Sequence, residues 1–333
     1  LVLHSIENLA KIREIERTLT DHQVPAALAN RVATQLVRRV GHAYAGDQEV
    51  WRALAALLRD EIAVLKKKLN LTDGQISWYD SQSHVAGRLA SVEINGLVRY
   101  FDTNTYYRQP VVRGAVEWKE PILLDEWRFA QSRSKAPVKA VLTGPVTLAS
   151  LALNKHYRTK KALALDLATA LAEEVGCLVR AGASHVQIDE PILTRHPEDV
   201  SLVSETLERI RAEKGNSSLI LFTFFGDVAK IYADLLDAPA DVLGLDLVQG
   251  SATWSALAEH GATKPLVLGL VDARNTKEEN PAAVAEKVLE LKGSVDLRTS
   301  YLSPSNGLEF LPRDRARNKL RILRSAANKV GVG

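Results

Sequence analysis

Two kinds of hydrophobic pattern divide the chain. In the first 68 residues, apolar positions recur at three- and four-residue intervals, as in "SIENLAKIREIERTL" and "QEVWRALAALLRDEIAVLKKKL", and this spacing is typical of amphipathic helices. From Ala140 onward, short apolar runs alternate with helical patterns. The runs are apolar on both faces, as parallel strands are when helices cover both sides of a sheet. The pattern therefore predicts a mainly helical region over residues 6–68, followed by alternating strands and helices.

The number of strand and helix pairs indicates the fold class. Six strands are predicted in the second part of the chain, beginning at Ala140, Val186, Leu219, Val242, Leu266 and Leu297. Two more, near Leu1–Ser5 and within Leu69–Trp78, bring the count to eight. Strict alternation to eight favours an α/β fold of the (β/α)8 TIM-barrel type over an open doubly wound sheet. No G-x-G-x-x-G follows any run, which counts against a dinucleotide-binding domain. We expect residues 1–333 to form a single barrel domain with an extended helical N-terminal region.

Composition and charge narrow the classes of partner. Of 333 residues, 46% are apolar and 25% charged, which is ordinary for a globular protein. The 43 basic and 40 acidic residues are spread along the chain, so no nucleic-acid partner is expected. One cysteine, Cys177, cannot form a disulfide within the chain and is predicted to be a core thiol. No apolar run is long enough to span a bilayer, and we expect a cytoplasmic protein without a membrane partner.

Polar side chains gather where the predicted strands end. In a barrel, binding and catalytic groups come from the loops that follow the carboxyl ends of the strands. We predict that the substrate-binding residues are those found there: Asp189, Glu190, Asp246, Asp272, Arg274, Asn275 and Asn306.

Most of these residues also have a structural alternative. Asp189 or Glu190 could cap the next helix or pair with Arg274, and Asp246 could be a helix N-cap. For Asp227, which also follows a strand, the cap is preferred. Asp272 and Arg274 could form a surface ion pair of little energetic weight. Their concentration at one predicted rim is harder to explain by stability alone.

Several motifs resemble those of a known family. The chain contains "YFDTNTYYRQP", "LTGPVTLA", "QIDEPIL", "LGLVDARNTK" and "SPSNGLEFLPRDRARNKLRIL" in this order. From about Leu71 to about Arg324 it resembles the cobalamin-independent methionine synthases. The resemblance implies a (β/α)8 barrel and methyl transfer from 5-methyltetrahydrofolate to homocysteine. It also implies that Asp189, in the I-D-E-P motif, binds the amine of the amino acid. Full-length members have two barrels, whereas this chain is long enough for one.

The resemblance does not extend to the family's zinc ligands. In the family's catalytic barrel, zinc is held by a His-x-Cys pair after the fifth strand, a glutamate after the sixth and a cysteine after the eighth. This chain has "FTFFGD" at Phe222–Asp227, then Asp246, then Asn306 at the corresponding places. Zinc prefers sulfur and nitrogen ligands, which are missing there. We therefore expect no metal and no cofactor evident in this chain, and a closer likeness to the family's N-terminal, non-zinc barrel.

Three functional hypotheses follow from the resemblance. The preferred one is a stand-alone N-terminal-type barrel that binds 5-methyltetrahydrofolate as a possible substrate, or acts with a separate zinc-bearing methionine synthase barrel. Arg274, Arg113 and Lys119 are then candidate partners for the anionic glutamate tail of folate. A second hypothesis is a methyltransferase in its own right, with Asp189 and Glu190 binding the amine of an amino acid. The third is a degenerate, non-catalytic ligand-binding barrel.

Overall fold

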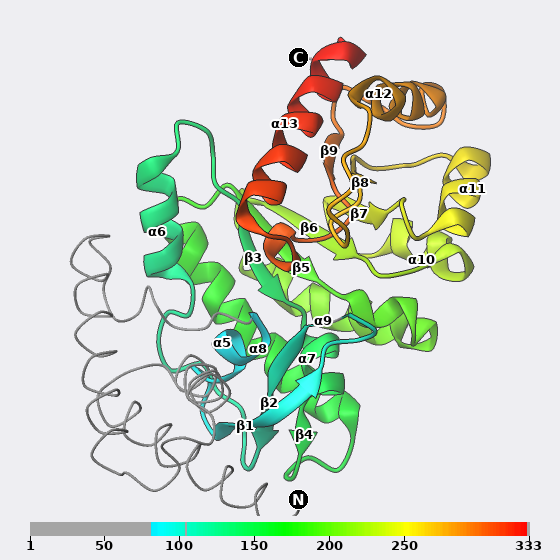
Figure 1. The fold of residues 1–333 in the computed structure, drawn as a ribbon. Coiled ribbons are helices and arrows are strands. Elements are labelled where there is room, and N and C mark those ends of the chain that lie inside the picture. Colours follow the sequence, from blue (N-terminus) through cyan, green and yellow to red (C-terminus); the bar gives the residue numbers. More distant parts are fainter. Residues whose placement is uncertain (1–80, 104, 332–333) are drawn as a thin grey trace, which may run out of the picture. The chain divides into compact units, whose positions relative to one another are not determined.

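Six parallel strands form the main sheet of the molecule. The computed structural model describes residues 81–103 and 105–331. The strands lie side by side in their order along the chain (Figure 1): β3 (Ala140–Thr143), β5 (His185–Asp189), β6 (Ser218–Thr223), β7 (Val242–Asp246), β8 (Leu266–Val271) and β9 (Tyr301–Pro304). Because parallel neighbours need a crossover, each strand is followed by helix before the next begins.

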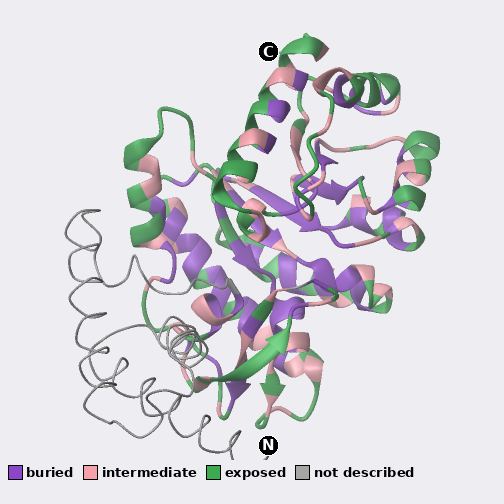
Figure 2. Ribbon diagram, in the orientation of Figure 1, coloured by how far each residue is buried: buried purple, intermediate pink, exposed green. Residues whose placement is uncertain are grey.

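The crossover helices pack on one side of this sheet. They are α7 (Pro145–Leu151), α8 (Lys160–Arg180), α9 (Val200–Ala212), α10 (Tyr232–Asp237), α11 (Ser251–His260), α12 (Pro281–Glu290) and α13 (Arg313–Val330). On β5, Val186 and Ile188 are fully buried in the core formed with these helices. The intervening Gln187 and Asp189 point to the opposite face, since side chains alternate along a strand. Figure 2 shows the buried strands and the exposed outer surfaces of the helices.

The sheet is curved like the wall of a barrel. Three strands separate β5 from β9, so a flat sheet would hold them roughly 19 Å apart. The rings of His185 on β5 and Tyr301 on β9 nevertheless lie with centroids 6.3 Å apart. The Tyr301 hydroxyl is 3.5 Å from Nε2 of His185. Both residues therefore project into a shared interior, and among the described strands β3 and β9 are the two edges of the curved sheet.

An antiparallel hairpin precedes the parallel sheet. β1 (Val92–Arg99) pairs with β2 (Tyr106–Val112), and β2 pairs in parallel with the short β4 (Leu153–Asn154). Helix α5 (Ser81–Ala86) comes before the hairpin, and α6 (Leu124–Arg133) follows it. The sequence pattern assigned no elements to this region. Its importance lies in the turn between β1 and β2, which contacts the ends of the barrel strands.

The predicted alternation of strands and helices is confirmed from Ala140 to the end of α13, with one local correction. The strand expected to begin at Leu297 begins instead at Tyr301. In the segment before Tyr301, the Asp296 carboxylate accepts the backbone N–H of Arg298, and the Asp296 carbonyl accepts the Ser300 hydroxyl. These local hydrogen bonds take the place of pairing with a neighbouring strand. The strand that begins at Ala140 ends at Thr143, because Pro145 begins α7.

Some predictions fall outside the described residues. The helices of residues 6–68 and the strands near Leu1–Ser5 and within Leu69–Trp78 are among them. The single domain over residues 1–333 therefore stays a prediction.

Candidate functional site

Asp189 is the last residue of β5 and lies on the inner face of the curved sheet. Its Oδ1 accepts a hydrogen bond of 2.6 Å from Nε2 of Gln187, which lies on the same face two residues earlier. Oε1 of Gln187 in turn accepts a hydrogen bond from Nζ of Lys139, just before β3. This contact fixes the orientation of the amide, because its carbonyl faces the lysine and its N–H faces Asp189.

The Asp189 carboxyl lies at the half-buried end of β5. Burial raises its pKa to about 7, while Gln187 and Lys139 act in the opposite direction and Glu309 raises the pKa further. A carboxyl with this pKa is poised between its two protonation states near neutral pH. A ligand cation that approaches it would restore the ionised form, because an opposite charge offsets the loss of hydration.

Glu190 serves the N-terminus of α7. The residue is fully buried, and its carboxylate oxygens accept the backbone N–H groups of Val146 and Thr147 at 2.9 and 2.7 Å. The Thr147 hydroxyl donates a third hydrogen bond of 2.6 Å. A Cβ atom at Gly144 would lie 2.3 Å from Oε1 of Glu190, so only glycine fits beside the carboxylate. Glu190 therefore caps α7, which precedes it in the chain, and not the next helix as the structural alternative had it, while a ligand role stays a prediction.

Tyr100 and Glu309 complete the surroundings of Asp189, and the sequence did not point to either. Tyr100 follows β1 and is 4% exposed. Burial raises its pKa well above 10, and Asp189, Glu309 and Glu190 raise it further, so its hydroxyl keeps its proton. Burial also raises the pKa of Glu309, although part of the residue is exposed. The Tyr100 ring stacks on Phe310 with centroids 6.3 Å apart. The result is an acidic site with an aromatic wall.

Asp246 and Asp227 are both committed to backbone groups. The Asp246 side chain accepts N–H groups from Phe225 at 3.1 Å, Val248 at 3.0 Å and Gln249 at 2.9 Å. Burial raises its pKa, and these bonds oppose the shift. Asp227 accepts the N–H of Thr253 in the first turn of α11, at 2.8 Å, so it binds the start of a helix from another loop and is not the predicted N-cap of the helix that follows it. Asp246 holds the loops after β6 and β7 together.

The loop after β8 brings Asp272, Arg274 and Asn275 together, as predicted. Asp272 accepts the backbone N–H of Arg274 at 2.7 Å and the side-chain amide of Asn275. Its own N–H donates to Glu279, which pairs at 2.7 Å with the buried Lys319 of α13. The loop is thus anchored from behind, and the Arg274 side chain is its group that extends toward the hairpin turn.

Asn306 follows β9 and is 2% exposed. Its amide donates to the Gly307 carbonyl at 2.9 Å, and its Oδ1 accepts the Ser305 hydroxyl at 3.1 Å. The resemblance places zinc ligands at three positions, which are occupied here by Phe224 and Phe225 after β6, by Asp246 and by Asn306. These residues do not fit zinc, because they supply one carboxylate already bound by backbone N–H groups and no sulfur or imidazole. Among residues 81–103 and 105–331, no group of three or more His, Cys, Asp or Glu could hold a metal ion.

The hairpin turn contributes a contact that the sequence did not predict. Oδ1 of Asp102 lies 3.3 Å from Nη2 of Arg274 and 3.7 Å from Nη2 of Arg195, which follows β5. The motif "YFDTN" contains Asp102 and Tyr100, but nothing in its local pattern indicated that it folds onto the strand ends. Only the tertiary packing of the hairpin reveals this.

Two basic candidates lie away from this turn. Arg113 directly follows β2 and forms an exposed ion pair with Glu93, at 2.6 Å. Between Tyr106 and Val112, β2 extends about 20 Å, so Arg113 is at the opposite end of the hairpin from Asp102. Lys119, farther along, is exposed. The structure therefore does not bring Arg113 to the strand ends, and a role for either residue with folate stays a prediction.

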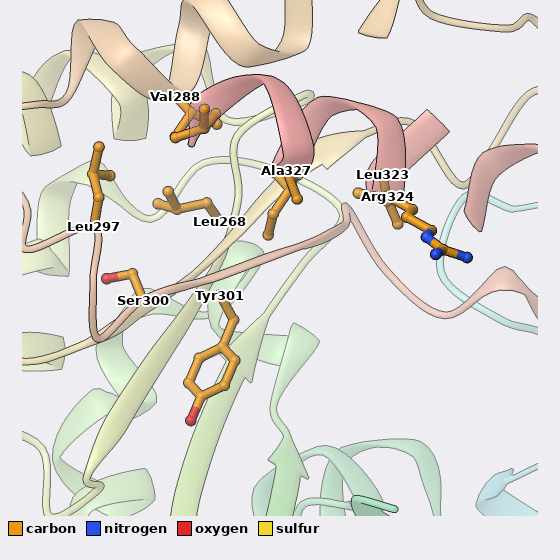
Figure 3. Close-up of a pocket in the computed structure, with 10 residues that line it drawn as sticks. Leu268, Val288, Leu297, Ser300, Tyr301, Leu323, Arg324 and Ala327 are labelled. Atoms are coloured by element: carbon orange, nitrogen blue, oxygen red, sulfur yellow. The ribbon is translucent and has the colours of Figure 1, made fainter. Parts of the chain in front are cut away.

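A pocket of about 370 Å³ lies elsewhere, between the sheet edge and its helices. It is mostly apolar and is lined by Leu268, Val288, Leu297, Ser300, Tyr301, Leu302, Leu323, Arg324, Ala327 and Val330. Figure 3 shows the Tyr301 ring and the Arg324 guanidinium directed away from Leu268 and Val288. Without converging polar groups, this pocket is a packing gap between β8, β9, α12 and α13 and is separate from the candidate site.

Cys177 on α8 is only partly exposed, and burial raises the pKa of its thiol. It is therefore a poor nucleophile, but it is not among the buried core residues, so the prediction of a core thiol is wrong. None of the helices within the described part of the chain is long and apolar enough to span a membrane.

Comparisons with known proteins agree with this architecture. The sequence profile described as "Cobalamin-independent synthase, N-terminal domain" matches residues 72–296. The methionine synthase of Saccharolobus solfataricus is 34% identical over 252 residues, which cover 75% of each chain. That of Sulfurisphaera tokodaii is 32% identical over 251 residues, covering 75% of this chain and 73% of the relative.

The fold is also similar to solved structures. A B12-independent methionine synthase from Shewanella sp. W3-18-1, in complex with selenomethionine, superposes with a TM-score of 0.69 at 21% identity and covers 81% of this chain and 86% of that one. A putative vitamin-B12-independent methionine synthase from Listeria monocytogenes superposes with a TM-score of 0.58 at 16% identity, covering 81% of this chain and 85% of the other. At these identities the likeness concerns the fold, and it confirms the predicted barrel type.

Proposed function

The chain belongs to the cobalamin-independent methionine synthase family, through its N-terminal domain, and from this premise we propose that it binds 5-methyltetrahydrofolate and works with a separate zinc-bearing catalytic barrel. The matched profile covers residues 72–296, and the matched relatives are methionine synthases. Those relatives are named as methionine synthases. That the synthesis of methionine is divided here between two chains is our inference.

One observation carries the proposal. Asp189 keeps a desolvated carboxyl at a strand end, with the side chain of Gln187 as its hydrogen-bond donor. The places corresponding to zinc ligands are instead filled by groups that serve local structure, such as Asp246 and Asn306. The site therefore retains what is needed to hold a ligand, whereas the residues at the zinc positions do not supply what is needed to activate a thiol.

The geometry suggests how a folate would be held. The ionised Asp189 would accept hydrogen bonds from the N–H groups of a pterin ring, and Tyr100 would donate from its protonated hydroxyl. The rings of Tyr100, Phe225 and Phe310 form a cluster with centroid distances of 5.8 to 6.3 Å, which suits contact with a flat ligand ring. A homocysteine thiol alone would keep a pKa of about 8.5 and be mostly protonated, so its activation would fall to the zinc of the partner barrel.

The test has two measurements on the full chain. Calorimetry with 5-methyltetrahydrofolate should detect binding, and Asp189→Ala should weaken it by about 1.5–3 kcal/mol through loss of a charge-assisted hydrogen bond. Methyl transfer to homocysteine should appear when the chain is mixed with a purified zinc-bearing methionine synthase barrel. Asp234→Ala, an exposed carboxylate on α10, is the matched control.

The outcomes separate the hypotheses. Binding without any effect on the partner barrel would favour a non-catalytic ligand-binding barrel. Methyl transfer by this chain alone would favour the second hypothesis from the sequence, a methyltransferase in its own right. The proposal is wrong if the chain neither binds 5-methyltetrahydrofolate nor changes the activity of a zinc-bearing barrel.

A further inference from the structure

Two arginines from different loops converge on one carboxylate of the hairpin turn. Arg195 follows β5, Arg274 follows β8, and their Nη2 atoms lie 3.7 and 3.3 Å from the same oxygen, Oδ1 of Asp102. Nη1 of Arg274 donates to Oε1 of Gln249 at 2.7 Å, which fixes the direction of the guanidinium. Segments far apart in the sequence thus build a site with two positive charges around one carboxylate.

Each arginine also rests on an aromatic ring. The guanidinium carbon of Arg195 lies 5.2 Å from the Phe101 ring centroid, and that of Arg274 lies 5.2 Å from the Phe225 centroid. Phe101 and Phe225 have φ angles of 51° and 75°, in the left-handed region. Non-glycine residues rarely adopt this conformation, and such backbone strain clusters at ligand sites. The strain here falls on the two residues that support the arginines.

The carboxylate that fills this site is poorly enclosed. The Asp102 side chain is 57% exposed, whereas that of Arg274 is 21% exposed. An exposed ion pair contributes little to stability, because water competes for both charges. The Arg274 side chain is much more enclosed than the carboxylate, and the Arg195 side chain, 46% exposed, is slightly more enclosed.

We propose that Arg195 and Arg274 form a binding site for a ligand carboxylate, and that Asp102 occupies this site as an internal substitute until a ligand displaces it. A carboxylate is the favoured ligand class because a carboxylate already fits between the two guanidinium groups. The site rests on the proposed function only for the identity of the molecule that brings this carboxylate. It extends the candidate site from the acidic surroundings of Asp189 to a basic position at the hairpin turn.

Displacement requires only a side-chain rotation. Arg99 holds the backbone of the turn, with Nε 2.6 Å from the Thr103 carbonyl and Nη2 2.9 Å from the Asp102 carbonyl. The Thr103 hydroxyl also donates to the Tyr100 carbonyl at 2.6 Å. The turn can therefore stay in place while the exposed Asp102 carboxylate swings into solvent.

The test uses glutarate, a small dicarboxylate, and follows the arginine side-chain signals by NMR titration of the full chain. Asp102→Asn removes the competing charge and should tighten glutarate binding about tenfold. Arg195→Met and Arg274→Met should each weaken binding about ten- to hundredfold, the loss expected for one charge-assisted hydrogen bond. Arg315→Met is the matched control, because Arg315 has the same side-chain exposure as Arg195, 46%, and pairs with Glu278 on the surface.

Each other outcome is decisive. If Asp102→Asn leaves glutarate affinity unchanged or lowers it, Asp102 does not compete with a ligand and the inference is wrong. Stronger binding of inorganic phosphate than of glutarate would overturn the ligand class, and a loss of binding in Arg315→Met would show that the signal is not local. Failure to bind 5-methyltetrahydrofolate would instead count against the proposed function while leaving the glutarate result intact.

Discussion

Asp189 and Asp246 occupy the same position in two repeats of one architecture, yet they have opposite surroundings. Each is the last residue of a parallel strand, β5 in one case and β7 in the other. Asp246 accepts three backbone N–H groups and thereby ties its loop in place. Asp189 accepts the side-chain amide of Gln187, and burial raises its pKa to about 7.

The difference shows that the donors bound to a carboxylate at a strand end help to distinguish a structural role from a ligand-binding role. A carboxylate bound by several backbone N–H groups already has hydrogen-bond donors that oppose the effect of burial on its charge, so it is a structural element of the loop. A carboxyl that is desolvated without such donors gains most from a ligand. By this criterion Glu190 belongs with Asp246, although it is adjacent to Asp189 in the sequence.

The largest expected effect on stability comes from removing the structural carboxylate Glu190. Glu190→Ala removes the acceptor for the N–H groups of Val146 and Thr147 and for the Thr147 hydroxyl, all buried. Leaving these donors unsatisfied should lower the free energy of unfolding by about 3–5 kcal/mol, measured by urea denaturation. Glu198→Ala is the control, because Glu198 is exposed and should have little effect. A loss for Glu190→Ala as small as that control would mean that the carboxylate does not cap α7.

An effect of intermediate size is expected when each of the two aspartates is replaced by asparagine, and its direction should differ between them. Asp246→Asn replaces one acceptor oxygen with an N–H₂ group that faces a backbone N–H, and should destabilise the protein by about 1–3 kcal/mol. Asp189→Asn keeps an oxygen for Gln187 and removes a carboxyl that ionises at a desolvated site. At pH 8 we therefore expect Asp189→Asn to raise the free energy of unfolding and Asp246→Asn to lower it.

The raised pKa of Asp189 predicts the direction in which the free energy of unfolding changes with pH. The folded pKa of Asp189, about 7, is above its ordinary value of 3.8, so its stabilising contribution is fully present below 3.8 and is lost as the pH rises through about 7. Asp189→Asn should flatten the decline in stability between pH 4 and 8. Glu190, whose pKa is also raised to about 7, should leave a residual slope. Equal slopes in the wild type and Asp189→Asn would contradict a raised pKa for Asp189.

The sequence predicted the repeating part of this molecule well, for a physical reason. Buried parallel strands and their covering helices are encoded locally, in apolar runs such as Val242–Asp246 and in helices such as α8. The strand ends followed from the strands, so Asp189, Asp246 and Asp272 were all found. Which of them is committed to backbone groups was not predictable, because their donors come from other loops, such as Phe225 for Asp246.

The hairpin marks the limit of prediction from local pattern. Its strand β1 is largely exposed and carries no clear alternation of buried and exposed positions beyond Asn95. Tyr100 and Asp102 therefore gave no periodic signal, and their approach to Asp189 and Arg274 depends on packing between distant segments. Of the site residues that the sequence missed, Tyr100, Asp102 and Arg195 meet only through this hairpin, whereas Glu309 comes from the 3-10 helix after β9.

The smallest expected effect concerns the support of Asp189 from behind. Lys139 donates to Gln187, and its positive charge lowers the pKa of Asp189. Lys139→Met should therefore move that pKa further upward and free the Gln187 amide to rotate. A ¹³C NMR titration of the Asp189 carboxyl should show a higher midpoint in Lys139→Met than in the wild type. Lys135→Met, which changes an exposed lysine of the same loop, should leave the midpoint in place. If both variants titrate like the wild type, Lys139 does not act through Gln187, and burial alone sets the state of Asp189.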